Sequence, residues 1–151
     1  MNNSSPLLEP RQLFGRQLAR AARQWRLVMN ERLLPYDLTE ATWLPLLHIA
    51  REKPMRQKQL AELLGIESSS LVRLIDALVA AGLVERKIEN DRRARVLCLT
   101  PQGYRLVAQV EAVSAEVRDR ALAGISDEAL AASFQVIEQI CASLNQQRAP
   151  E

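Results

Sequence analysis

The chain has 151 residues, 48% of them hydrophobic and 25% charged, and its formal net charge at pH 7 is +2. This length and composition predict one ordinary globular domain with a core of its own, and the five glycines and seven prolines are too few for a low-complexity chain. The small net charge excludes a simple polycation that would bind nucleic acid by charge alone.

The two cysteines, Cys98 and Cys141, stand in unrelated contexts without a Cys or His at a metal-ligand spacing. They predict a reducing intracellular compartment. The amino-terminal residues lack the basic and apolar regions of a signal peptide, and no apolar run reaches the roughly 18 residues of a membrane span. We therefore expect a cytoplasmic protein with no metal, no cofactor and no membrane contact.

Two helices are predicted in the first third of the chain. From Pro10 to Leu33 apolar residues recur at three- and four-residue steps, which predicts a long amphipathic helix that ends before Pro35. Its apolar stripe consists of Phe14, Leu18, Ala21, Trp25 and Val28. Thr39 suits the N-cap of a second helix that ends before Pro54. Pro45 lies inside this second helix and removes one backbone hydrogen bond, so we expect a kink or a loosened first turn.

Two shorter helices follow, each ended by a glycine. The third runs from about Gln57 to Leu64 and stops at Gly65, and the fourth runs from about Ser68 to Ala81 and stops at Gly82. The apolar residues that we expect these helices to bury are Leu60, Leu63, Leu64, Leu71, Leu74, Ile75 and Leu78.

Two short strands, Val84 to Ile88 and Arg95 to Leu99, then flank a polar turn. Between Arg86 and Arg95 five side chains are basic and two acidic, whereas residues 101–151 carry four basic and seven acidic groups. Positive charge is therefore concentrated at the ribbon. Two helices joined by a tight turn and followed by a basic hairpin predict a winged helix-turn-helix, mainly α with a small β wing. The second of these helices suits the major groove of B-DNA, and the hairpin tip suits the minor groove.

The last third predicts two more helices. Thr100 and Pro101 suit the N-cap and first position of a fifth helix, and Ser126 caps a sixth whose first turn is acidic. On a lone copy the first, fifth and sixth helices would leave apolar stripes in water, which predicts a homodimer. The alternative is that they pack only on their own subunit. We expect dimerisation helices at 8–34 and 101–148, a DNA-binding lobe at 38–100 and disordered ends at 1–7 and 149–151.

The fourth helix is expected to touch DNA. Ser68, Ser69 and Ser70 fill its first turn, where free backbone N–H groups can approach phosphates and base edges. One turn further on, Arg73 can bind a guanine edge or a phosphate. The alternative is that the serines only cap the helix and that Arg73 pairs with Asp76. Because the helix follows a tight turn and precedes a basic hairpin, we favour contact with DNA.

The ribbon is expected to enter the minor groove. Arg92, Arg93 and Arg95 crowd a tip that also carries Asp91. A carboxylate two residues before an arginine can hold its guanidinium extended, so less side-chain entropy is lost in the groove. The alternative is a solvated charged turn. Weaker candidates for phosphate contacts are Arg56, Gln57 and Lys58.

These residues resemble the MarR family (multiple antibiotic resistance regulators) of winged-helix dimers, and within it the SlyA-like branch. The resemblance runs from about Leu38 to Gly103. It is carried by Gln59-Leu60-Ala61, Leu71-Val72-Arg73, Gly82-Leu83-Val84-Glu85-Arg86, Asp91-Arg92-Arg93-Ala94-Arg95 and Leu99-Thr100-Pro101-Gln102-Gly103. The family's Asp-x-Arg wing motif falls on Asp91 and Arg93, and the recognition-helix arginine falls on Arg73. Departures from the family are Arg56 and Glu67, where Ser or Thr caps are usual, and Pro45.

The predicted function is a dimeric, sequence-specific regulator of transcription on double-stranded DNA, with a pseudo-palindromic site. The resemblance implies a repressor that a small aromatic or carboxylate ligand releases. Such a ligand would lie between the dimer helices and the DNA-binding lobe, near Arg16, Trp25, Tyr36, Trp43 and His48. The alternative is that the aromatic residues and the histidine are ordinary core residues. Redox sensing through a cysteine is a further alternative.

The sequence is also compatible with other functional classes. The winged helix could be an adaptor that acts through protein–protein contacts, or the chain could activate transcription by antagonising a nucleoid protein. An enzyme is not expected, because a single histidine, no zinc-spaced ligands, no Gly-rich phosphate loop and no nucleophile elbow leave nothing to carry catalysis.

Overall fold

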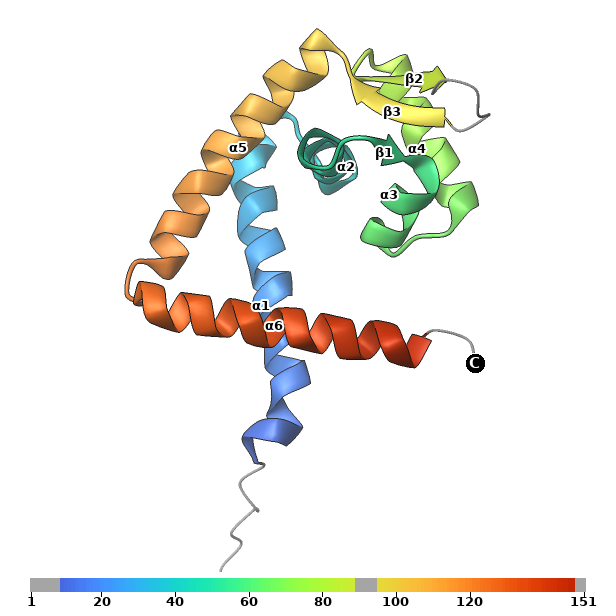
Figure 1. Ribbon diagram of the computed structural model, residues 1–151. Helices are drawn as coiled ribbons and strands as arrows, with labels where there is room; N and C mark the ends of the chain where they lie inside the picture. The colour runs from blue at the N-terminus through green and yellow to red at the C-terminus, as the bar shows by residue number, and fades with distance from the viewer. Residues whose placement is uncertain (1–8, 89–94, 149–151) are drawn as a thin grey trace, which may run out of the picture. The chain divides into compact units, whose positions relative to one another are not determined.

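The computed structural model describes residues 9–88 and 95–148 (Figure 1). These residues form two compact units, divided between Val117 and Arg118. Its elements are α1 (Pro10–Leu33), the 3-10 turn η1 (Leu34–Tyr36), α2 (Glu40–Arg51), β1 (Met55–Arg56), α3 (Gln57–Leu64), α4 (Ser68–Ala80), β2 (Val84–Ile88), β3 (Arg95–Leu99), α5 (Pro101–Leu122) and α6 (Asp127–Arg148). The six helices and two strands that the sequence predicts are confirmed, whereas β1 and η1 were not predicted.

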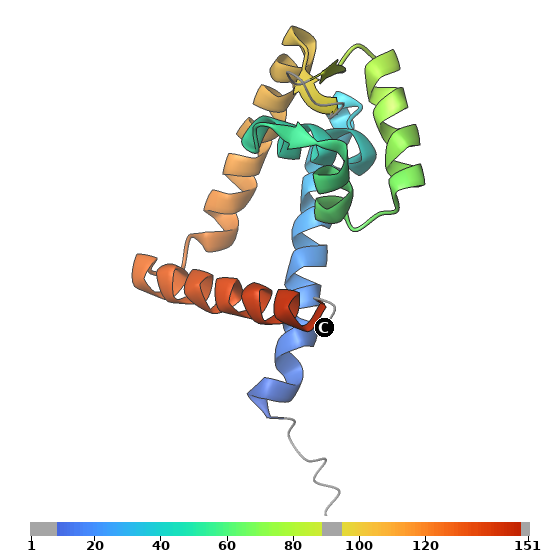
Figure 2. The same ribbon diagram turned by 45° about the vertical axis from the view of Figure 1, so that its right-hand side comes forward.

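The helix-turn-helix consists of α3 and α4, which lie side by side in Figure 2. Gly65 ends α3 with φ 65°, and Gly82 follows α4 with φ 73°. Both values lie in the left-handed region that glycine adopts without steric cost, so the two predicted stops are confirmed and have a local cause.

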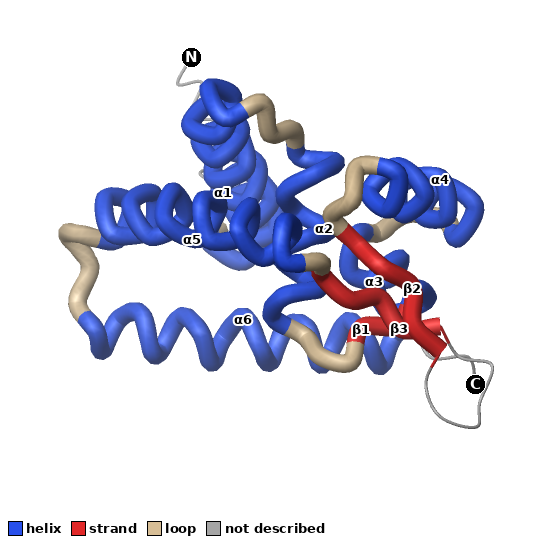
Figure 3. The backbone as a smooth tube through the Cα atoms, turned by 90° about the horizontal axis from the view of Figure 1, so that it is seen from above, coloured by secondary structure: helices blue, strands red, loops and turns tan. Residues whose placement is uncertain are grey.

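The sheet has three antiparallel strands in the order β1-β3-β2 (Figure 3). β2 and β3 pair along their whole length, from Val84 opposite Leu99 to Ile88 opposite Arg95. β1 pairs with β3 only at its own two residues, Met55 and Arg56. One step further along this register Pro54 would face β3, and a proline has no N–H to donate to a ladder. β1 therefore ties the start of α3 to the central wing strand but covers little of its edge.

A hydrophobic core fills the first unit. It takes Met29 and Leu33 from the end of α1, together with the inner faces of α2, α3, α4, the strands and α5. Of the residues predicted to be buried in α3 and α4, those that are buried are Leu60, Leu71, Ile75 and Leu78, and those that are half-buried are Leu64 and Leu74. Leu63 was predicted wrongly, because it is 42% exposed. Ala61 completes the buried face of α3 with Leu60 and Leu64, and Leu63 lies roughly 100° away from the centre of that face.

The junction between β3 and α5 is fixed by backbone contacts. Thr100 Oγ1 accepts from the Gly103 N–H at 3.0 Å, which confirms Thr100 as the N-cap, and it donates to the Gly82 carbonyl at 2.6 Å. A Cβ on Gly103 would lie 2.2 Å from the carbonyl oxygen of Leu83. Only glycine fits at this position, so α5 begins in close contact with the end of α4 and the start of the wing.

Pro45 is accommodated inside α2. The helix continues from Glu40 to Arg51, and Pro45 itself is buried. The first turn is intact, since the N–H groups of Thr42 and Trp43 both donate to the Thr39 carbonyl at 2.9 Å. Of the two effects that the sequence predicts, a kink or a loosened first turn, the loosened first turn is absent, because the missing donor lies beyond that turn.

The terminal helices expose much apolar surface. Along α1 only Met29 and Leu33 are buried, and the predicted stripe that includes Phe14 and Trp25 is exposed. In the second unit Ser126 Oγ accepts from the Ala129 N–H at 3.2 Å and caps α6 as predicted, but no residue of α6 is buried. Within residues 9–88 and 95–148 no helix is long and apolar enough to cross a membrane. The dimerisation and DNA-binding roles assigned to 8–34, 101–148 and 38–100 stay predictions, and residues 1–7 and 149–151 lie outside the described ranges.

Candidate nucleic-acid interface

The first turn of α4 leaves its backbone donors available. Glu67 is the N-cap, its side chain makes no capping hydrogen bond, and the first N–H of the helix with a backbone acceptor is that of Leu71, which donates to the Glu67 carbonyl at 3.0 Å. Ser68, Ser69 and Ser70 are exposed, and their N–H and hydroxyl groups have no partner among the described residues. The serines therefore do not simply cap the helix. Free donors at the positive end of a helix dipole suit a phosphate.

Arg73 lies on the exposed face of α4, together with Asp76, as the sequence predicts. The alternative pairing of these two residues is wrong. Asp76 Oδ1 instead accepts a hydrogen bond of 2.5 Å from Arg86 Nη2 of β2. Within the part of the chain that the structure describes, Arg73 has no hydrogen-bond or ion-pair partner. Its guanidinium is therefore available to an external acceptor.

Arg86 connects three elements of the lobe. Besides its bond to Asp76 on α4, its Nε donates to Gln57 Oε1 at the start of α3, at 3.4 Å. The Arg86 side chain is 22% exposed, against 58% for that of Asp76, so the guanidinium is partly shielded from water. We call Arg86, Asp76 and Gln57 the Arg86 brace. The brace links α4 to the strand β2 and to the start of α3.

The structure describes only some of the other predicted DNA contacts. Lys58 is exposed in the first turn of α3, and Arg95 is exposed at the start of β3. Gln57 is half-buried, and its side-chain oxygen is engaged in the brace. The predicted contacts at the tip of the wing, Asp91, Arg92 and Arg93, lie outside the described residues.

Comparison with known proteins identifies the family. Residues 36–94 match the model of the MarR family. The chain also resembles the crystal structure of the transcriptional regulator PA3341, with 41% identity and a TM-score of 0.83 over 88% of this chain and 98% of that one. The chain belongs to the MarR family of transcriptional regulators. The SlyA-like branch stays a prediction.

Two more distant MarR proteins share the fold. One is a MarR family regulator from Listeria monocytogenes complexed with 26mer DNA, at 18% identity and a TM-score of 0.77 over 87% of this chain and 89% of that one. The other is Staphylococcus aureus MarR in complex with salicylate and kanamycin, at 20% identity and a TM-score of 0.75 over 91% of this chain and 93% of that one. At this identity they show the fold of a MarR protein and no more.

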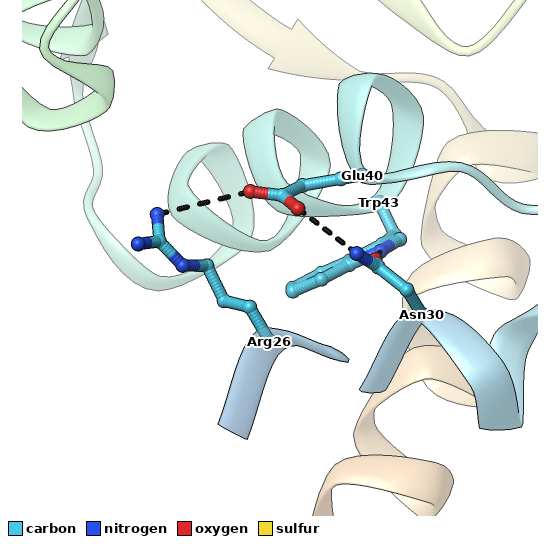
Figure 4. Close-up of polar contacts among 4 residues, drawn as sticks. All are labelled: Arg26, Asn30, Glu40 and Trp43. Atoms are coloured by element: carbon cyan, nitrogen blue, oxygen red, sulfur yellow. Dashed lines mark hydrogen bonds and ion pairs between the residues drawn. The ribbon is translucent and has the colours of Figure 1, made fainter. Parts of the chain in front are cut away.

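Trp43, a predicted ligand contact of this MarR protein, is buried and hydrogen-bonded within the protein (Figure 4). It is 3% exposed, and its Nε1 donates to Asn30 Oδ1 at 2.9 Å. Asn30 Nδ2 in turn donates to Glu40 Oε2 at 3.0 Å, and Arg26 lies 3.8 Å from the same carboxylate. The network joins the end of α1 to the start of α2 and uses the one polar atom of the indole.

The other predicted ligand contacts are scattered. Trp43 and His48 are five residues apart on α2, which places them about 140° apart around the helix. Arg16 and Trp25 are nine residues apart on α1, about 13 Å along its axis. Arg16, Trp25 and Tyr36 are exposed, whereas His48 is half-buried. One protomer does not bring the five together, and their contact with a ligand stays a prediction.

His48 is the sole histidine of this MarR chain. Burial lowers its pKa below the ordinary value of 6.5, and Arg51 adds to this effect while Glu52 opposes it. The side chain is therefore held in its neutral form near neutral pH. No group of His, Cys, Asp and Glu side chains among the described residues could hold a metal ion.

The Arg86 brace is the feature that sequence reasoning missed. Asp76 was correctly placed on the exposed face of the fourth helix, and Arg86 was counted only as part of the basic ribbon. The available signal was the tight turn at Gly82, which brings the strand straight back beside the helix. An acid on the outward face of the helix and a basic residue early in that strand are then neighbours.

Proposed function

We propose that this MarR protein is a sequence-specific regulator of transcription that binds double-stranded DNA as a homodimer. The observation that carries the proposal is the surface of α4, where three free backbone N–H groups and the guanidinium of Arg73 face outward. The Arg86 brace holds this surface in a fixed relation to the wing. A phosphate-binding helix start, a base-reading arginine and a basic ribbon provide the three kinds of contact that a winged helix makes with a duplex.

The terminal helices support the homodimer. Phe14 of α1 is 44% exposed and Phe134 of α6 is 65% exposed, within amphipathic helices that bury little or nothing on their own chain. Apolar surface left in water costs about 25 cal/mol per Å², so several hundred Å² of it favours association by several kcal/mol. A two-fold dimer presents two copies of α4, which predicts a pseudo-palindromic site with half-sites about 34 Å apart.

The proposal includes repression that a small aromatic or carboxylate ligand relieves. The DNA complex of the Listeria relative supports binding to a duplex, and the salicylate complex of the Staphylococcus relative supports binding of a small aromatic carboxylate. The proposal also includes the cytoplasmic location that the sequence predicts, because a protein that regulates genes must be in the same compartment as the DNA.

The test begins with selection of bound duplexes from a random DNA pool, followed by mobility shifts on the selected site. Arg73→Ala should weaken binding by about fivefold or more, because one bidentate contact to a base is worth about 1–3 kcal/mol. Arg105→Ala is the matched control, since Arg105 is an exposed cation of α5 without a partner among the described residues. Affinity should also fall steeply with salt.

Two results would refute the proposal. One is equal loss of affinity in the Arg73 and Arg105 variants, which would reduce the role of Arg73 to its charge. The other is a protein that binds no duplex more tightly than a neutral control at moderate salt. That second result would favour the adaptor function instead.

A further inference from the structure

The helix α5 packs against the first unit along one line. Beyond its first turn the buried residues, which we call the valine row, are Val107, Val110, Val113 and Val117. At the start of the helix, Gly103 leaves no room for a Cβ beside the Leu83 carbonyl, so the first turn is closely packed. Contacts along one line do not by themselves prevent a helix from rolling about that line. The direction of α5 therefore also depends on contacts to either side of the valine row.

Two glutamates of α5 form ion pairs on opposite sides of the valine row. Both carboxylate oxygens of Glu111 accept from Arg51 at the end of α2, from its Nε at 3.1 Å and from its Nη2 at 3.2 Å. Glu116 accepts from Nη2 of Arg32, in the last turn of α1. At 100° per residue, Glu111 lies about 105° to one side of the centre of the valine row and Glu116 about 115° to the other. We call these four residues the α5 clamp.

The clamp acts far from the start of the helix, where a small change of direction produces a large displacement. At a rise of 1.5 Å per residue, Glu111 lies about 12 Å and Glu116 about 20 Å along the axis from Gly103. A hydrogen bond stretched by about 1 Å is lost, so the pair at Glu111 tolerates a tilt of only about 5° about the first turn. Because the two pairs lie on opposite sides of the valine row, a roll in either direction stretches one of them.

We propose that the α5 clamp determines which spacing of half-sites the protein accepts, an inference that rests on the proposed function. In the proposed homodimer α5 connects the DNA-binding lobe to the dimer interface, so a tilt of α5 on the lobe moves α4 relative to α4 of the second copy. Half-sites one base pair further apart lie about 3.4 Å further along the duplex. A tilt of about 5° displaces α5 by only about 2 Å at Val117, so an intact clamp resists a change of one base pair. The four residues act through α5 and are positioning residues.

The size of the effect follows from the exposure of the clamp. Its four side chains are between 36% and 55% exposed, so solvent screens both ion pairs. Breaking one such pair changes an equilibrium by up to about fivefold. The bidentate contact of Arg51 with Glu111 has the geometry in which an exposed pair contributes most. A displaced half-site requires one lobe to tilt on α5, which stretches the pairs of that lobe and makes the displaced site weaker than the selected one.

The experiment measures the affinity of the full chain, by fluorescence anisotropy, for duplexes with the selected half-site spacing and with one base pair added or removed. The readout is the ratio of the affinity at the selected spacing to that at the changed spacings. Glu111→Gln with Glu116→Gln should lower this ratio by about threefold or more, because a tilted lobe then breaks no ion pair. Glu31→Gln with Glu62→Gln removes the same charge from two exposed acids without a partner among the described residues, and should leave the ratio unchanged. Glu111→Arg alone should lower the ratio, and adding Arg51→Glu should restore it.

Double-mutant cycles in urea test the clamp without DNA. Arg51→Met with Glu111→Gln, and Arg32→Met with Glu116→Gln, should each lower the free energy of unfolding by less than the sum of the two single losses. The inference is overturned if the losses are additive in either cycle, if the parent protein binds all three spacings equally, or if the clamp variant and its control change the ratio equally. Failure of the parent protein to bind any duplex refutes the proposed function instead, and the urea cycles still decide the clamp.

Discussion

The Arg86 brace leads to a prediction about DNA affinity whose sign distinguishes two roles of Asp76. If its only role were electrostatic, Asp76→Asn would strengthen DNA binding, because it removes a negative charge from the face that meets a polyanion. If the brace orients α4, the same substitution weakens DNA binding, because it removes the charge of the carboxylate that accepts the 2.5 Å bond from Arg86 and leaves only a weaker, neutral acceptor. The two roles therefore predict changes of opposite sign.

The size of the effect follows from the exposure of the pair. Arg86 and Asp76 are 22% and 58% exposed, so solvent screens their attraction and the pair contributes about 1 kcal/mol or less to stability. The bond to Gln57, at 3.4 Å, adds little. If up to about 1 kcal/mol holds one orientation of α4, its loss lowers affinity by up to about fivefold for one half-site and about 30-fold for two.

Fluorescence anisotropy with the selected duplex measures the affinity, and urea unfolding measures the stability. Glu62→Gln is the matched control, because Glu62 is an exposed acid of α3 without a partner among the described residues. The double variant Arg86→Met with Asp76→Asn should be weakened no further than Arg86→Met alone. Tighter DNA binding by Asp76→Asn, or additive losses in the double variant, would refute the role of the brace.

Three further predictions concern stability. Gly103→Ala should lower the free energy of unfolding by about 1–3 kcal/mol in urea titrations, because its Cβ would clash with the Leu83 carbonyl oxygen. Gly15→Ala is the control: no atom lies near its Cβ on α1, so it should raise the free energy of unfolding by about 0.5–1 kcal/mol. Trp43→Phe should lower it by about 1–3 kcal/mol, since it leaves the Asn30 oxygen without its donor; an unchanged urea midpoint would contradict this. The unfolded chain binds more protons than the native chain between the lowered pKa of His48 and 6.5, so stability should rise with pH across that window. His48→Gln should remove this slope in urea midpoints measured from about pH 5 to 8, and a slope that persists would show another group at work.

The sequence predicted the surface of α4 well. Ser68, Ser69, Ser70 and Arg73 are all exposed, as expected from a helix whose opposite face carries Leu71, Ile75 and Leu78. This success has a simple cause, because the 3.6-residue period decides which side of a helix faces the core. The same reasoning was wrong for Leu63, since α3 is too short for its apolar residues to define one face without knowledge of its neighbours.

The hydrogen-bond partners of individual polar side chains could not be predicted from the sequence. The turn at Gly82 brings β2 back beside α4, but no local pattern decides that Asp76 pairs with Arg86, ten residues away, and not with Arg73. Nor does any local pattern indicate that Asn30 of α1 accepts from the indole N–H of Trp43 on α2. The sequence could not predict β1 either, because two residues are too few to show an alternating pattern. They form a strand only because they pair with β3.

The sequence by itself determined where the helices and wing strands begin and end, since caps, glycine stops and periodicity act within a few residues. Only the tertiary structure decided how α3, α4 and β2 are joined by Arg86, and that Arg32 and Arg51 meet the glutamates of α5. These features depend on residues far apart in the chain, and folding alone brings such residues to within hydrogen-bond distance.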